Sequence, residues 1–449
     1  MSVDLHTREI KPLRNTFAHT AKYVGNDKPA SRYQEATLGT QPTANFHYRP
    51  TWDPAHEIFD ASRSAIKLAD WNALRDPRQY YYATWTMARA RQQDAIEASY
   101  DFVESRGLLA KMSDAVRAKA CEVLMPLRHV AWGGNMNNSS IGAYGYGTPF
   151  TAPAMFHAMD HLGAAQFITR LGLALDEPGA LQAGKNDWLK GACWQALRHY
   201  VEDTLVLSDP VELFVAQNFA LDGQLYPLIY GSFVDDHIVP QGGTAIAMLT
   251  AFMPEWHDES ARWIDAVLKI AAAESSDNQQ LISGWAKSWA DRAQAALAPV
   301  AELALGAAGQ QALQAARDGL DLRSKKTGIA VSAGGMHQAR VKQNHRARRA
   351  FGRDDAAVFA ASALHQLADQ IIADRPQRIA GGGEVVFGID HAFFMAAGDE
   401  HQRAVVLVHV VQKNRDVHGA LCGHHVVVEP GAVVLVPLPH IAPQTPSCR

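Results

Sequence analysis

Helical patterning runs through most of this chain and constrains its fold more than any other feature. Before residue 328, apolar residues recur at helical spacing in segment after segment, while strand patterns are nearly absent. In the first long segment, Asp76 predicts an N-cap, Pro77 suits the first helical position and Gly107 suits the end. We predict helices over residues 76–106, from about 113, and over 152–175, 187–207, 210–234, 256–273, 278–305 and 309–322. A mostly α domain of about eight to ten helices follows, consistent with a bundle elaborated by extra helices.

The composition excludes several classes of protein. With 42 basic and 46 acidic side chains in 449 residues, the chain offers no strong attraction for nucleic acid or an anionic membrane. Four cysteines without CxxC spacing argue against a disulfide framework or a structural zinc site. No apolar window approaches the roughly 18 residues that a membrane span needs, and residues 1–14 lack the apolar core of a signal peptide. We therefore expect a cytoplasmic protein that binds neither nucleic acid nor membranes.

Residues 1–52 differ from the helical region. They hold few apolar residues at helical spacing and several prolines, so we predict an extended N-terminal arm that needs a partner to order it. A loop folded back on its own domain fits equally well. The arm and the following helix supply Tyr, Trp, Phe and Arg, and Tyr, Trp and Arg in particular anchor protein interfaces. The predicted partner interface consists of Arg32, Tyr33, Phe46, Tyr48, Arg49, Trp52, Tyr81 and Trp85.

The composition changes abruptly after about residue 327. All 10 Trp and all 12 Tyr precede residue 290, whereas half of the 20 His follow residue 330. Apolar runs at 404–411 and 424–436 predict strands, the second run forming a hairpin around a Glu-Pro-Gly turn. Two interpretations stay open, a frameshift product that would be poorly folded and a fused small module, and with them whether this extension is β-rich or disordered. The predicted domains are an arm at 1–52, a helical domain at 53–326 and an atypical extension at 327–449.

Two of the helical segments carry a resemblance to a known family. The segments DPRQYYYATWTMARARQQ (76–93) and NMNNSSI (135–141) closely resemble the β subunit of bacterial multicomponent phenol hydroxylases, which belong to the soluble di-iron monooxygenases. The resemblance extends over about residues 28–325, with further matches at 198–203, 215–223, 247–253 and 259–266. It implies a ferritin-like helical bundle from which the metal ligands have been lost.

The resemblance also implies a place in a larger enzyme. The chain would be a structural subunit, without catalytic residues or a cofactor of its own, in an (αβγ)₂ hydroxylase that inserts one atom of O₂ into phenol or a related arene. Its partners would be the α and γ subunits and a second αβγ protomer. In that family the α subunit carries the di-iron centre, a reductase with FAD and an iron–sulfur cluster brings electrons from NADH, and a small effector protein gates the reaction. The chain would then be enzymatic only within the complex.

The ligand pattern of di-iron bundles is missing from the sequence. Such bundles take a Glu from each of two helices and a Glu-x-x-His pair from each of two others, and no Glu-x-x-His occurs here. The nearest substitutes are His157, Asp160 and His161, which could share one helical face, and further carboxylates on later helices are Glu202, Asp203 and Asp222. Two His and a carboxylate could hold a single divalent ion. Hydrogen bonds to neighbouring helices account for them more simply. The alternatives to a structural subunit are thus a free-standing protein that binds a single metal ion, or a scaffold whose C-terminal module binds a ligand.

Overall fold

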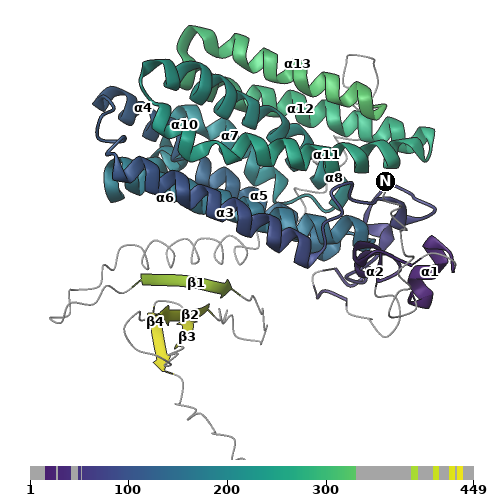
Figure 1. Cartoon of the computed structure of the whole chain (residues 1–449). Coiled ribbons are helices and arrows are strands. Elements are labelled where there is room, and N and C mark those ends of the chain that lie inside the picture. The colour runs from purple at the N-terminus through teal and green to yellow at the C-terminus, as the bar shows by residue number, and fades with distance from the viewer. Residues whose placement is uncertain are drawn as a thin grey trace, which may run out of the picture. The chain divides into compact units, whose positions relative to one another are not determined.

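The structure, a computed structural model, describes residues 16–26, 29–41, 49–51 and 53–329, together with the backbone of four strands between residues 386 and 437. By its internal contacts the chain divides into two units, Met1–Gly335 and Met336–Arg449. The first unit holds the helices and the second the strands, and each is described by itself (Figure 1).

Part of the predicted N-terminal arm is helical instead of extended. It contains α1 (Ala18–Val24) and α2 (Arg32–Thr37). The second helix begins with a capping box, in which Ser31 Oγ accepts a hydrogen bond from the Gln34 amide and Gln34 Oε1 accepts one from the Ser31 amide. Tyr33 is buried, and its hydroxyl accepts a 2.8 Å hydrogen bond from the Asp76 amide. At α2 the arm therefore folds onto its own domain.

The helical unit is built around long helices that pack along one another (Figure 1). After the short 3₁₀ turns η1 (Ala61–Arg63) and η2 (Trp71–Ala73), the main helices are α3 (Tyr82–Ser105), α4 (Asp114–Leu124), α5 (Leu127–Tyr144), α6 (Thr148–Lys190), α7 (Ala192–Thr204), α10 (Thr244–Thr250), α11 (Phe252–Ala273), α12 (Ser276–Leu305) and α13 (Gly309–Thr327). The longest pairing joins α5 to α6, and α12 packs against α7, α11 and α13. Fully buried aromatic residues, among them Trp194, Trp263 and Phe214, fill the core between them.

Several predicted helix boundaries are wrong. The first long helix begins at Tyr82 rather than near Asp76, because the buried Asp76 carboxylate accepts hydrogen bonds from the amide and guanidinium of Arg78 in a tight bend. Gln79 in that bend has a φ of 55°, which a helix cannot accommodate. The helix predicted over 152–175 extends over Thr148–Lys190 and absorbs the predicted start of the next one.

The helix predicted over residues 210–234 departs from α-helical winding twice. The chain passes through α8 (Pro210–Phe214), a π-helical segment η3 (Val215–Leu221), α9 (Asp222–Tyr226) and a second π-helical segment η4 (Pro227–Ile238), before a 3₁₀ turn, η5 (Val239–Gln241). π-helical turns are rare and concentrate at functional sites. They direct attention to the side chains around α9.

In the second unit, the described residues form two antiparallel pairs of strands. β1 (Val386–Ala392) pairs with β2 (Val408–Lys413), and β3 (His424–Glu429) pairs with β4 (Ala432–Pro437). In the second pair Glu429 lies opposite Ala432, so β3 and β4 coincide with the predicted hairpin. Within the part of the chain that the structure describes, no helix has both the length and the apolar composition needed to cross a membrane.

Candidate functional site

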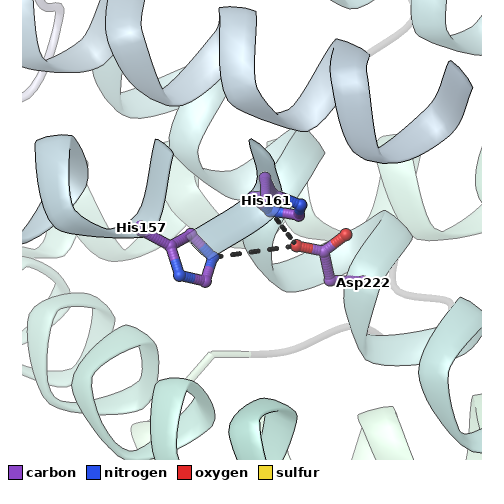
Figure 2. Close-up of side chains that lie close together, drawn as sticks. All are labelled: His157, His161 and Asp222. Atoms are coloured by element: carbon purple, nitrogen blue, oxygen red, sulfur yellow. Dashed lines mark ion pairs between the residues drawn. The ribbon is translucent and has the colours of Figure 1, made fainter. Parts of the chain in front are cut away.

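Two histidines and an aspartate meet inside the helical unit. His157 and His161 lie one turn apart on α6, and Asp222 is the first residue of α9, directly after the π-helical segment η3 (Figure 2). Asp222 Oδ2 lies 3.2 Å from His161 Nε2 and 3.9 Å from His157 Nε2. All three side chains are at most 3% exposed. The geometry thus brings three potential metal ligands together away from bulk solvent, and we call these residues the His–His–Asp group.

Most polar atoms of the His–His–Asp group have no hydrogen-bond partner among the described residues. The ring nitrogens of both histidines and Asp222 Oδ2 are buried and lack a partner in hydrogen-bond geometry. The other carboxylate oxygen, Oδ1, accepts a 2.9 Å hydrogen bond from Gln217 Nε2. Gln217 Oε1 in turn accepts a 2.8 Å bond from Asn137 Nδ2 on α5. This chain of amides fixes the carboxylate so that its free oxygen faces the imidazoles.

Aromatic rings and a glycine surround the group. Trp256 stacks on His157 with 4.9 Å between ring centroids, and Trp263 meets the same imidazole edge-on at 5.4 Å. On the opposite helix, Gly134 leaves room for His161, since a Cβ at that position would lie 2.6 Å from His161 Nδ1. The surroundings are therefore apolar and closely fitted, which increases the cost of any uncompensated charge.

Burial and nearby charged groups shift the pKa values of His157 and Asp222. Burial lowers the pKa of His157 to about 4, so its imidazole is neutral near pH 7. Burial acts to raise the pKa of Asp222, but the electrostatic effect of the two nearby imidazoles, His161 first, outweighs it and lowers that pKa to about 2. Asp222 is therefore a carboxylate over the whole physiological range.

A small cavity adjoins the group. Its volume is about 10 Å³, and its wall includes His161, Asp222, Tyr226 and Tyr230. That volume is close to the minimum for one water molecule, and the imidazole and carboxylate on its wall would give such a water polar partners.

Asp160, predicted to share a site with the two histidines, faces elsewhere. Its carboxylate accepts hydrogen bonds from Arg89 Nε at 2.7 Å and Nη2 at 2.8 Å, and from the indole nitrogens of Trp85 at 3.0 Å and Trp256 at 2.9 Å. These hydrogen bonds use both carboxylate oxygens of Asp160 and link α6 to α3 and α11. The structure therefore does not bring the Asp160 carboxylate together with the two imidazoles; the carboxylate beside them is that of Asp222, from a later helix.

The residues predicted to contact a partner fall into three groups. Phe46, Tyr48 and Trp52 lie outside the described residues. Arg32 and Arg49 are exposed, and Arg49 Nη1 donates to the Pro54 carbonyl at 3.0 Å. Tyr33 is buried within its own domain, whereas Tyr81 and Trp85 are half-buried. Tyr33 and Trp85 thus make hydrogen bonds within this chain, to Asp76 and Asp160 respectively.

The part of the chain that matches known proteins is the helical unit. A model of the methane/phenol/alkene hydroxylase family matches residues 52–275. The chain is 44% identical over 331 residues to phenol 2-monooxygenase, oxygenase component DmpL, of Pseudomonas sp. (strain CF600), a match that spans 73% of this chain and 98% of that protein. It is 23% identical over 297 residues to the toluene-4-monooxygenase system hydroxylase component subunit beta of Ectopseudomonas mendocina, spanning 63% of this chain and 89% of that protein. A chain of the crystal structure of phenol hydroxylase from Pseudomonas sp. OX1 superimposes with a TM-score of 0.68 at 39% identity, over 74% of this chain and 100% of that one.

Proposed function

The chain belongs to the methane/phenol/alkene hydroxylase family, and from that membership we propose that it is the non-catalytic β subunit of a phenol hydroxylase-type monooxygenase. The mostly α, ferritin-like fold predicted from the resemblance is confirmed. As a hydroxylase component, the chain would work with an α subunit that holds the iron, a γ subunit and a second αβγ protomer. Electrons from NADH would arrive through the FAD and iron–sulfur reductase, with the effector protein as regulator.

The observation that supports this proposal most directly is that the His–His–Asp group contains a single carboxylate. A di-iron centre of the bundle type takes a Glu from each of two helices and a Glu-x-x-His pair from each of two more. Among the described residues, the group that could hold metal offers two imidazoles and a single carboxylate. The neighbouring Asp160 is committed to Arg89. These residues do not fit a carboxylate-bridged di-iron centre, which supports the proposal that the oxygen chemistry takes place in another subunit.

One relative supports the same assignment. The toluene-4-monooxygenase protein that this chain matches over 63% of its length is named a hydroxylase subunit beta. The phenol 2-monooxygenase relative, at higher identity, gives the substrate class, phenol or a related arene. The pocket that selects the arene would lie in the α subunit.

A partly uncovered helix indicates where the α subunit would bind. The buried residues of α3 are Ile96, Tyr100 and Val103, all in its C-terminal half. In its N-terminal half Tyr82 and Met87 are 70% and 51% exposed, and on α6, to which α3 is tied through Asp160, Met155 and Met159 are 41% and 48% exposed. Exposed apolar residues on two neighbouring helices are candidates for a protein interface. We name Tyr82, Met87, Met155 and Met159 the α3–α6 face and assign it to the α subunit.

Packing of the α subunit on this face would let this subunit stabilise the iron site. Catalytic constellations must be held within about half an ångström by surrounding structure. A rigid β subunit, with its own buried aromatic core, would restrict the motion of the α helices that carry the iron ligands. Loss of the β subunit should then reduce iron occupancy and coupled turnover in the α subunit.

Co-expression tests the proposed function. The chain is produced with and without its cognate α and γ subunits, and the mass of the complex, the iron content of each subunit and phenol turnover with reductase and effector are measured. We expect an (αβγ)₂ assembly with iron in α, and no turnover by this chain alone. A chain that stays apart from α and γ, or that hydroxylates phenol without α, would overturn the proposal.

A further inference from the structure

We propose that His157, His161 and Asp222 bind a single divalent transition-metal ion of the Zn²⁺ class, which ties α6 to α9 inside this subunit. The ion would have three protein ligands, His157 Nε2, His161 Nε2 and Asp222 Oδ2, and a water molecule as the fourth ligand. This site is separate from any di-iron chemistry. It depends on this chain's own residues and not on the β-subunit assignment.

The distances in the group match a tetrahedral site. Zn²⁺ binds imidazole nitrogen and carboxylate oxygen at about 2.0–2.2 Å, so two ligand atoms at a tetrahedral angle lie roughly 3.4 Å apart. Asp222 Oδ2 lies 3.2 Å from one Nε2 and 3.9 Å from the other, and the ligand atoms are all within 4.8 Å of one another. The two distances from Asp222 Oδ2 lie close to this value, and the widest separation in the group would close from at most 4.8 Å to roughly 3.4 Å around an ion.

The unsatisfied atoms of the group point the same way. Buried polar groups are almost always hydrogen-bonded, and each exception calls for an explanation such as an ion. Here both Nε2 atoms and Asp222 Oδ2, the three proposed donors, are buried without a partner in hydrogen-bond geometry. A divalent ion would bind a lone pair of all three atoms at once. A single water molecule would interact with the same three atoms more weakly.

The support behind Asp222 is that of a metal-bound carboxylate, whereas the Nδ1 atoms of both histidines have no hydrogen-bond partner among the described residues. Metal-bound carboxylates are usually held by a hydrogen bond to their second oxygen. Gln217 Nε2 donates such a bond to Asp222 Oδ1 and is itself held by Asn137. The cavity of about 10 Å³ beside His161 and Asp222 leaves space for a bound water. The stacked Trp256 excludes further solvent.

Metal titration of the full-length chain tests the proposal. After chelation, Co²⁺ is added and its visible absorption, which reports tetrahedral nitrogen and oxygen ligation, is followed together with the thermal unfolding midpoint. We expect one Co²⁺ per chain, displaced by Zn²⁺, and a midpoint that rises with ion concentration because binding favours the folded state. Absence of stoichiometric binding, or an unfolding midpoint unchanged by the ion, would overturn the site. In the assembled hydroxylase, zinc is counted separately from iron, so a failed site leaves the subunit assignment intact.

Variants locate the ion. Asp222→Asn and His161→Gln should each abolish the Co²⁺ spectrum, and Gln217→Leu should weaken affinity about 10- to 100-fold, as loss of a supporting hydrogen bond does. The matched control is His257→Gln, a buried histidine outside the group that stacks on Tyr226. It should bind Co²⁺ as the parent chain does. Binding that survives both Asp222→Asn and His161→Gln would place the ion elsewhere and refute the assignment.

Discussion

At the scale of single residues, two glycines within helices differ in whether the surrounding structure has room for a side chain. A Cβ on Gly134 would lie 2.6 Å from His161 Nδ1, whereas nothing lies within 4 Å of a Cβ on Gly163. We expect Gly134→Ala to destabilise the chain by about 1–3 kcal/mol through overpacking. Gly163→Ala should stabilise it by about 0.5–1 kcal/mol through helix propensity. Urea unfolding of both variants measures the two effects, and equal effects would contradict the close fit around His161.

A buried histidine predicts how stability depends on acidity. Burial, followed by the charge of Arg323, lowers the pKa of His257 from 6.5 to about 3. The folded chain thus keeps the imidazole neutral, while the unfolded chain protonates it below about pH 6.5. The stability from this group is present above that pH and is lost as the pH falls toward 3.

Comparison of variant and parent isolates this contribution. Between pH 7 and pH 5 a single histidine of this kind removes about 2 kcal/mol from the free energy of unfolding. His257→Gln should start from a lower stability but lose about 2 kcal/mol less than the parent over the same interval. Denaturant unfolding at the two pH values measures the difference, and parallel losses would show that His257 is not buried in its neutral form.

At the scale of helices, local signals succeeded where no distant contact competed with them. A helix was predicted from about residue 113, and the Ser113 hydroxyl does accept a hydrogen bond from the Val116 amide at the start of α4. At Asp76 the same kind of signal failed, because Tyr33 and Arg78 claim its amide and carboxylate. The π-helical winding of η3 and η4 could not be predicted from 3.6-residue periodicity.

The candidate site was half predictable for a similar reason. His157 and His161 are four residues apart in one helix, so their common face follows from helical geometry. Asp222 comes from a distant segment, and its approach depends on how α9 packs and on the π-helical turn before it. Asp160, at the favoured spacing, is instead captured by Arg89, a choice that only the packing of α3 decides.

The α3–α6 face gives a prediction about assembly. Met87 and Met159 are 51% and 48% exposed, so Met87→Glu and Met159→Glu should change the chain's own stability by no more than about 0.5 kcal/mol. A charge buried without a partner at an interface should, however, greatly reduce recovery of the α–β complex. Leu322→Glu, on α13 at 58% exposure, is the matched control outside the face. Complex mass after co-expression measures the outcome, and undiminished assembly of both methionine variants would place the α subunit on another surface.

At the scale of the whole molecule, the helical unit ends with its own complete structure. Gly328 closes α13 in the left-handed conformation, with a φ of 77°. Ile329 is 2% exposed, and its amide donates to the Ser324 carbonyl at 3.0 Å. The match to the phenol 2-monooxygenase relative spans 98% of that protein but only 73% of this chain. We therefore propose that subunit function resides in the helical unit and that the extension is dispensable for it.

Truncation after residue 330 tests whether the helical unit functions without the extension. The shortened chain keeps the Gly328 cap and the buried Ile329, so its thermal midpoint and its assembly with α and γ should equal those of the full chain. A second truncation, after residue 308, removes α13 with the buried Leu313 and Leu320. Loss of each such side chain typically costs about 2–5 kcal/mol, so this control should unfold or fail to assemble. If the first truncation also loses assembly, the extension is a functional part of the subunit, and a frameshift origin would be excluded.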